Sequence, residues 1–363
     1  MKPAQDVTGW VMSCFQSLRR SQQKTLAAIL PAALRVHHIT LASLGRAMAG
    51  PAAAKHRIKR ADRFLGNGRI EPADAMAGVA RRLLARRTKP VVVLLDWVDI
   101  RQFMVRVAAL SFRGRALPLA WACYEKWEFF RSQNALEEGL LTVLRTILPL
   151  PRPVIVVADR GFGRVSLARH MENLKFHYVL RVKGKVWIDH ADYWGRLDRF
   201  PLRPGQSHAL REVRYSKEHG FPTNLVAAWG TGAKEPWFLI TDLERPAAAV
   251  TALYGLRMRI EELFRDYKNI RNGWALRQTQ VRSPQRLSRL LLVLAAAYVL
   301  LIACGLRMVA RFDARDWSSA NRPGRCSLWT LGRLLAADKV PSLRDLLATL
   351  AAALRIEAIP NWG

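Results

Sequence analysis

Residues 153–185 read PVIVVADRGFGRVSLARHMENLKFHYVLRVKGK, and this stretch decides the fold class. The β-branched run before Asp159 predicts a strand, and the glycines that follow it predict a turn. A helix and a second strand are expected in the remainder. Two such strands joined through a helix are expected to lie parallel in one sheet, with a right-handed crossover.

The preceding residues extend this pattern toward the N-terminus. In residues 91–100, VVVLLDWVDI, the β-branched run predicts a strand that ends at Asp96, and residues 101–125 predict two more strands around a glycine-containing turn. Asn134 and Glu137 form a capping-box pattern that predicts the start of a helix. The order strand-strand-strand-helix-strand-helix-strand indicates an α/β fold, with a mixed sheet flanked by helices.

The flanking regions differ from this core. Residues 1–89 are basic and predict helices near 5–30, 40–49 and 71–87. Strands are expected near 207–215, 224–230 and 236–241, and helices dominate after 284 around a loop near 312–327. We therefore expect five regions: a helical DNA-binding region 1–89, the first part of a catalytic core 90–184, a β-rich insertion 185–247, the second part of the core 248–310, and a C-terminal helical region 311–363.

The composition indicates a polyanionic partner. The chain has 58 Lys and Arg against 28 Asp and Glu, a formal charge of +30. Its four cysteines have no zinc-ligand spacing, and the N-terminus has no signal-peptide pattern, so a reducing bacterial cytoplasm is expected. The apolar run Leu290 to Leu306 is expected to be a buried core helix rather than a membrane span.

Residues 251–277, TALYGLRMRIEELFRDYKNIRNGWALR, carry the most informative spacing. On one continuous helix, Tyr254, Arg257, Glu261 and Lys268 would share an arc roughly 60° wide. An adjacent apolar face would contain Leu256, Ile260, Leu263, Phe264 and Tyr267. A carboxylate beside a phenol and two cations suits metal-assisted chemistry on a nucleic-acid backbone.

Two aspartates are expected to complete a site with this glutamate. Asp96 and Asp159 are each predicted at the C-terminal end of a core strand, where parallel strands place ligand sites. With Glu261 they would form a cluster of hard oxygen ligands suited to Mg²⁺ or Mn²⁺, probably two ions. Alternatives remain for each: Asp159 could cap the helix beginning near Phe162, and Asp99 competes with Asp96.

Glu262 competes with its neighbour Glu261 for the catalytic role. It lies about 100° around the helix from Glu261, so it is expected to face solvent or to pair with Arg259 or a neighbour of Asp266.

The chain resembles the DDE-type insertion-sequence transposases that bear a Tyr-x2-Arg-x3-Glu-x6-Lys signature, here Tyr254, Arg257, Glu261 and Lys268. VLLDWVDI (93–100) and VVADRGFG (156–163) resemble the segments around the family's first and second aspartates, at Asp96 and Asp159. Segments 57–67, 179–185 and 236–243 also resemble family segments. Val98 departs from the family, which often has threonine there.

This resemblance implies an RNase H-like core interrupted by a β-rich insertion, and two divalent metals held by Asp96, Asp159 and Glu261. It implies cut-and-paste transposition, in which water nicks a transposon end and the freed 3′-hydroxyl attacks, in some members through a DNA hairpin. The three other signature residues would hold phosphates. The partners would be double-stranded DNA, at the inverted-repeat ends and at the target, and a second copy of the chain in a homodimeric synaptic complex.

Further DNA contacts are expected from cations and one aromatic residue: Arg160, Lys183, Lys185, Trp187, Lys59, Arg60 and Arg63. Trp187 could stack on an unpaired base, although sheet packing is an alternative. No membrane partner is expected. Two other functions stay open, namely an RNase H-like nuclease that does not join strands and a DNA-binding derivative without catalysis.

Overall fold

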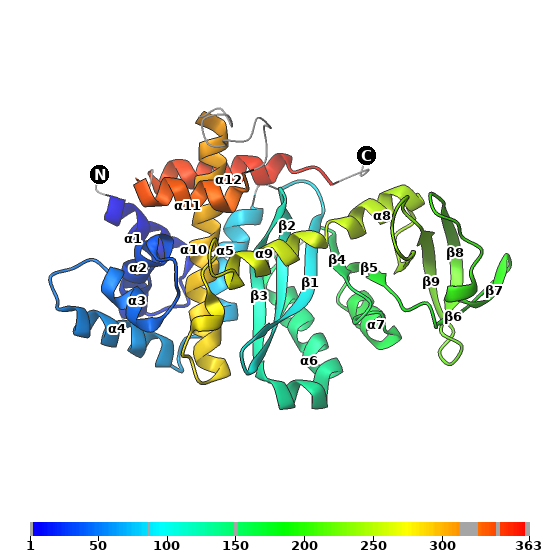
Figure 1. Cartoon of the computed structure of the whole chain (residues 1–363), viewed down its shortest axis with the longest axis horizontal. Coiled ribbons are helices and arrows are strands. Elements are labelled where there is room, and N and C mark those ends of the chain that lie inside the picture. The colour runs from blue at the N-terminus through cyan, green and yellow to red at the C-terminus, as the bar shows by residue number, and fades with distance from the viewer. Residues whose placement is uncertain (1–2, 86, 149–151, 312–325, 339–341, 360–363) are drawn as a thin grey trace.

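The computed structural model describes residues 3–85, 87–148, 152–311, 326–338 and 342–359. Within these residues, ten strands form one mixed sheet that is flanked by helices (Figure 1). The strand order is β3-β2-β1-β4-β5-β10-β9-β8-β6-β7. The predicted α/β class with a mixed sheet is therefore confirmed.

Helices precede the first strand: α1 (Pro3–Cys14), α2 (Arg20–Arg35), α3 (Leu41–Ala47), α4 (Ala54–Gly66) and α5 (Pro72–Leu84). The single helix expected near 5–30 is wrong, because the chain turns between α1 and α2. Phe15 and Leu18 are buried in this turn, and the Leu18 N–H donates to the Phe15 carbonyl at 3.0 Å. The turn lets both helices bury an apolar face. The basic segment 57–67 forms most of α4.

The core follows the predicted order: β1 (Val91–Ile100), β2 (Phe103–Phe112), β3 (Arg115–Glu125), α6 (Lys126–Ile147), β4 (Val154–Ala158), α7 (Val165–Asn173) and β5 (His177–Arg181). The first three strands are antiparallel neighbours, whereas β4 is parallel to β1 and β5 is parallel to β4. The helix start predicted from the capping-box pattern at Asn134 is wrong. The helix begins at Lys126 and has a kink at Ser132.

Residues 185–247, predicted to be a β-rich insertion, contain β6 (Trp187–His190), β7 (Tyr193–Arg196), the short 3-10 helix η1 (Leu197–Arg199), β8 (Ser207–Tyr215), β9 (Phe221–Ala228) and β10 (Trp237–Thr241). Strand β10 pairs antiparallel with β5, so these strands extend the sheet formed by β1 to β5. Sequence reasoning missed β6 and β7. Each has four residues, too few for an alternating pattern to be evident.

The chain returns to the core through α8 (Ala247–Gly255), α9 (Met258–Lys268), η2 (Leu276–Gln278), α10 (Pro284–Arg311), α11 (Leu328–Asp338) and α12 (Leu343–Ile356). Figure 1 shows α10 running between the N-terminal helices and β3. By length and composition α10 could cross a membrane, but its apolar window is wholly buried inside the protein. This agrees with the expected core helix. Of the loop expected near 312–327, residues 312–325 lie outside the described residues.

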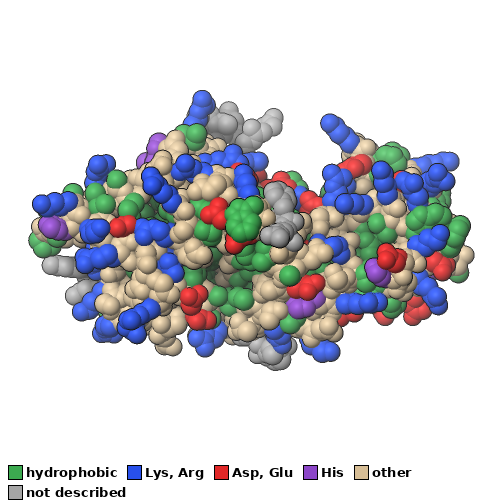
Figure 2. Space-filling model, turned by 90° about the horizontal axis from the view of Figure 1, so that it is seen from below, with side chains coloured by type: hydrophobic (Ala, Val, Ile, Leu, Met, Phe, Trp, Pro, Cys, Tyr) green, Lys and Arg blue, Asp and Glu red, His purple; other side chains and the backbone are tan. Residues whose placement is uncertain are grey.

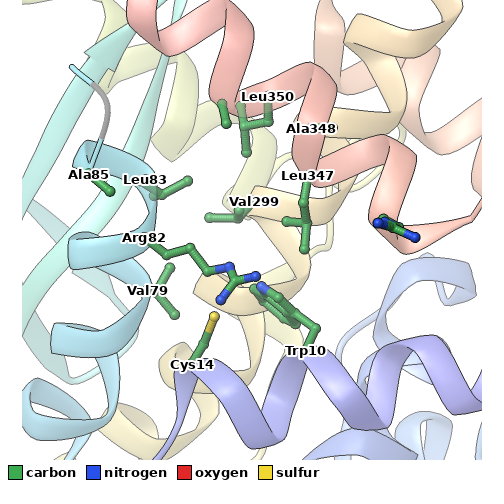
Figure 3. Close-up of a pocket in the computed structure, with 12 residues that line it drawn as sticks. Trp10, Cys14, Val79, Arg82, Leu83, Ala85, Val299, Leu347, Ala348 and Leu350 are labelled. Carbon is green, nitrogen blue, oxygen red and sulfur yellow. The ribbon is translucent and has the colours of Figure 1, made fainter. Parts of the chain in front are cut away.

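A cavity of about 540 Å³ lies among the helices, between α1, α5, α10 and α12. Its walls are largely apolar, and the Arg82 side chain extends toward Trp10 and Cys14 (Figure 3). No residue of β1, β4 or α9 lines it. The cavity is therefore separate from the edge of the sheet where the predicted carboxylates lie.

A buried carboxylate joins α9 to the sheet and to α10. The Asp266 side chain lies 3.0 Å from Arg115 Nε on β3, and it accepts a hydrogen bond from the Tyr298 hydroxyl on α10 at 2.7 Å. Burial raises the pKa of Asp266 to about 7, although Arg115 and Tyr298 act to lower it. Because the unfolded-state pKa is near 3.8, the folded protein retains this proton between about pH 4 and pH 7.

This carboxyl is expected to make stability fall as pH rises. Because its pKa is higher in the folded state, the protonated Asp266 carboxyl stabilises the folded protein fully below about pH 4. This stabilisation is lost progressively as the pH rises to about 7. The change is at most about 4 kcal/mol, from 1.36 kcal/mol per pKa unit. Urea denaturation of wild type and Asp266→Asn at pH 5 and pH 8 measures it. The wild type should lose more stability than the variant; equal losses would contradict the assignment.

Candidate active site

Asp96 and Asp159 are adjacent in the sheet. The parallel pairing of β1 with β4 ends at Leu95 and Ala158, and each aspartate is the next residue of its strand. The position expected for Asp96 is partly wrong, because β1 continues to Ile100 and Asp96 still pairs with Val107 of β2. The two carboxylates therefore lie where β4 ends, although β1 itself continues.

Asp159 is not the cap of the following helix. Helix α7 begins at Val165, with Arg164 at its N-cap. The Asp159 carboxylate instead accepts from the Gly161 N–H at 3.3 Å, and its carbonyl accepts from the Phe162 N–H at 2.9 Å. Asp159 thus begins a tight loop after β4.

The signature residues do not lie on one continuous helix, which corrects the prediction. Tyr254 is in the last turn of α8, Arg257 is at the junction, and α9 begins at Met258. At the junction the Leu256 and Arg257 N–H groups donate to carbonyls three residues earlier. Helix α8 packs on β9, β5 and β8, whereas α9 packs on β1, β2 and β3. The break lets each helix follow a different part of the twisted sheet.

Arg257 connects two of the three predicted carboxylates. Its Nη1 donates to Asp96 Oδ2 at 3.0 Å, and its Nη2 donates to Glu261 Oε1. The side chains of Arg257 and Asp96 are 12% and 16% exposed, whereas that of Glu261 is 41% exposed. The guanidinium thus lies between a strand carboxylate and a helix carboxylate at the protein surface.

The three carboxylates interact electrostatically. The pKa of Asp96 is raised to about 6, mainly by burial and also by the charges of Asp159 and Glu261. The Trp97 N–H and Arg257 act in the opposite direction. Among the described residues, no group of three or more His, Cys, Asp or Glu side chains is close enough to hold a metal ion. In this arrangement Arg257, a single cation, offsets part of the repulsion among the carboxylates.

Tyr254 and Lys268 lie at the margin of this cluster. The Tyr254 ring packs edge-on against Trp237 at a centroid distance of 4.8 Å and is buried. Burial raises the Tyr254 pKa, while the charge of Arg257 lowers it. Burial also lowers the pKa of Lys268, and Asp99 and Asp96 raise it. All four signature side chains are therefore within electrostatic range of the carboxylates, despite the break in the helix.

The two competing carboxylates have other partners. Glu262 lies 3.3 Å from Arg115 and 2.8 Å from Arg265. The expected pairing with a neighbour of Asp266 is therefore confirmed at Arg265, whereas the alternative pairing with Arg259 is not. Asp99 pairs with Lys126 at 2.5 Å and with Arg277 at 3.5 Å. Both carboxylates thus have cationic partners other than Arg257.

The remaining predicted DNA contacts lie in two separate places. Near the insertion, Lys183 and Lys185 are exposed, Arg160 lies 3.7 Å from Glu235, and Trp187 contacts the Trp194 ring at 4.8 Å.

On α4, Lys59 and Arg63 are exposed, while Arg60 donates to the Lys24 carbonyl at 3.0 Å. Figure 1 places α4 and the insertion at opposite ends of the molecule. Figure 2 shows Lys and Arg side chains over both ends. The structure therefore does not bring these predicted contacts into one site.

The comparison with protein families agrees with this geometry. Residues 133–300 match the model of the transposase DDE domain. This segment is similar to a transposase DDE domain. The match supports the resemblance to DDE-type insertion-sequence transposases, and it includes Asp159 and Glu261 but begins after Asp96. No curated protein matches the chain.

Proposed function

We propose that the protein is a DNA transposase that cleaves transposon ends and joins the freed 3′-hydroxyls to target DNA. The observation that carries the proposal is the cluster of Asp96, Asp159 and Glu261 around Arg257, two of whose carboxylates belong to the matched DDE domain. The alternatives are a nuclease that does not join strands and a DNA-binding protein without catalysis.

We also propose that the first five strands form an RNase H-like core. The order β3-β2-β1-β4-β5 supports this, with three antiparallel strands followed by two strands parallel to β1. In this division the insertion is 185–247, and the core resumes with α8 and α9. The helices of residues 1–89 and the α4 cations would contact the transposon ends.

The three carboxylates are of the ligand type that Mg²⁺ or Mn²⁺ prefers, although in this structure they do not lie close enough together to hold an ion. Asp96, Asp159 and Glu261 supply hard oxygen ligands. Burial and, to a smaller extent, the charges of Asp159 and Glu261 raise the pKa of Asp96, and a bound cation would lower it. Bound there, two such ions would supply the positive charge that activates an attacking water or 3′-hydroxyl and stabilises the leaving oxygen. Because Arg257 contacts two of these carboxylates, a cation at this position must compete with its guanidinium.

The signature cations would hold the DNA strand at the carboxylates. A guanidinium can bind a phosphate through two parallel hydrogen bonds, so Arg257 could exchange a carboxylate for a phosphate oxygen when DNA binds. Lys268 would act as a point charge for a neighbouring phosphate. The ring of Tyr254 is buried, and its packing would orient the hydroxyl for contact with a phosphate. The net charge of +30 agrees with binding of two DNA ends by a homodimer.

The test is cleavage of DNA that flanks the gene. Fragments containing each flank, incubated with the protein and Mg²⁺, should be cut at a defined position and then joined to a supercoiled plasmid. Cutting without joining would favour the nuclease. Binding without either reaction, in Mg²⁺ and in Mn²⁺, would favour the non-catalytic protein and contradict the proposal.

Lys268→Ala is expected to weaken DNA binding and its salt dependence. Loss of one phosphate contact lowers the slope of log K against log salt concentration by about 0.9. Fluorescence anisotropy of a labelled flank fragment between low and moderate salt measures this slope. Lys89→Ala is the control, since Lys89 is exposed before the amino end of β1. An unchanged slope for Lys268→Ala would mean that Lys268 contacts no phosphate.

A further inference from the structure

The loop that carries Asp159, residues 159–164, is held from two sides by side chains outside it. We infer that Glu137 on α6 and Tyr215 on β8 are positioning residues that fix this loop, and with it the Asp159 carboxylate, in the geometry that cleavage needs. The inference rests on the proposed function, because it gives Asp159 a part in the reaction.

Glu137 acts on the loop through Arg164. The Glu137 side chain is fully buried, where it pairs with Arg164 Nη2 and accepts from Gln133 Nε2 at 3.0 Å. The Nη1 of Arg164 donates to the Gly161 carbonyl at 3.1 Å, two residues after Asp159. A buried ion pair is strongly disrupted when one partner is removed, because the other charge is left without compensation. Glu137 therefore fixes the guanidinium that holds the loop.

The Glu137 carboxylate also compensates the charge of a second cation, Arg106, which is buried. Arg106 on β2 is 1% exposed, and none of its side-chain nitrogens has a hydrogen-bond partner. Its guanidinium lies over the Tyr124 ring, 5.7 Å from the centroid. Arg106 interacts electrostatically with Glu137 and Arg164. Glu137 thus offsets two cations beneath the sheet, on the side where Trp97 packs against Phe129 of α6.

Tyr215 holds the loop from the insertion. Its buried hydroxyl donates to the Gly163 carbonyl at 2.8 Å. The loop also packs closely against β5, since a Cβ on Gly163 would lie 2.6 Å from the Arg181 carbonyl oxygen. The next residue of the insertion, Ser216, donates its N–H to the Trp187 carbonyl at 3.0 Å. The same hairpin therefore contacts the Asp159 loop and supports the aromatic pair Trp187 and Trp194.

The contacts from Glu137 and Tyr215 fix the backbone of the Asp159 loop, which the Asp159 carboxylate does not fix by its own hydrogen bond. The hydrogen bond from the Gly161 N–H to Asp159, at 3.3 Å, is long, so the loop backbone must be fixed by other groups. Groups that orient a metal ligand typically change metal affinity or activity by about 10–100-fold when they are removed. We expect effects of this size from Glu137 and Tyr215.

The experiment compares Glu137→Gln and Tyr215→Phe with matched controls. Glu138→Gln removes the same charge from the next residue of α6, and no described side-chain contact links Glu138 to the loop. Tyr178→Phe removes another buried hydroxyl, which contacts Thr223 at 3.0 Å. Three quantities are measured with the flank DNA: the single-turnover cleavage rate, the Mn²⁺ concentration for half-maximal cleavage, and the Kd for DNA. Mn²⁺ binding without DNA is followed by electron paramagnetic resonance, and folding by thermal denaturation.

Each test variant should cleave about 10–100-fold more slowly and need several-fold more Mn²⁺, with the DNA Kd unchanged. Both controls should cleave at the wild-type rate. Normal Mn²⁺ dependence and normal cleavage in both test variants would overturn the inference, as would equal effects in the controls. If Glu137→Gln does not fold, Tyr215→Phe decides alone. Asp159→Asn is measured in parallel: an active Asp159→Asn contradicts the proposed function, whereas an inactive one beside active test variants contradicts only the inference.

Discussion

Asp96→Ala, Asp159→Ala and Glu261→Ala are each expected to abolish DNA cleavage while leaving binding to transposon ends nearly intact. Each substitution removes a carboxylate from the cluster around Arg257. Metal-assisted stabilisation of transition-state charge amounts to several kcal/mol, and about 4 kcal/mol corresponds to roughly a 10³-fold loss of rate. Single-turnover cleavage and anisotropy with the same DNA fragment measure the two effects separately.

Glu262→Ala is the matched control, because Glu262 adjoins Glu261 but pairs with Arg115 and Arg265. It should cleave at nearly the wild-type rate. Substantial strand transfer by any of the three carboxylate variants would count against the cluster. If Glu262→Ala folds normally but does not cleave DNA, the catalytic glutamate is Glu262 and not Glu261.

Trp274→Ala is expected to cause a large loss of stability, about 3–5 kcal/mol. The Trp274 side chain is fully buried, and its indole N–H donates to the Ala33 carbonyl on α2 at 3.1 Å. Its ring contacts Tyr267 of α9, Tyr298 of α10 and Trp329 of α11. Truncation would leave a cavity where four helices meet and an acceptor without its donor. Chemical denaturation measures the loss.

Trp127→Ala provides the comparison, because the Trp127 side chain is 65% exposed. Surface substitutions of this kind usually change stability by no more than about 0.5 kcal/mol. Because Trp274 links α9 to three other helices, its loss should also lower the cleavage rate at temperatures near the midpoint of unfolding. A Trp274→Ala protein as stable as wild type would show that the aromatic cluster is not a principal part of the core.

The sequence predicted the order of the core elements because each element has a local pattern. The β-branched runs at 91–100 and 153–158 correspond to β1 and β4, and the glycines at 161 and 163 correspond to the turn after β4. The same reasoning failed where local patterns conflict with packing. The capping pattern at Asn134 and Glu137 is a true local signal, yet the helix starts earlier and Glu137 is buried against Arg164.

The candidate site was predictable in its residue types but not in its geometry. The spacing of Tyr254, Arg257, Glu261 and Lys268 predicts a shared site on one continuous helix, whereas the structure has two helices that meet at Arg257. Nothing in the local sequence indicates that Arg257 donates to Asp96, which lies 161 residues earlier in the chain. The buried Arg106, the partly buried Arg164 and the hydroxyl of Tyr215 gave no signal, since each depends on a partner from another element.

The sequence by itself determined which segments are strands and helices, the basic character of the surface, and the presence of carboxylates at the ends of apolar runs. These properties follow from side-chain periodicity and composition, which act over a few residues. Only the tertiary structure decided that β10 joins β5, that α8 and α9 separate, and that Arg257 lies between Asp96 and Glu261. Register and packing decide such contacts, because a side chain's environment there is set by residues far away in the chain.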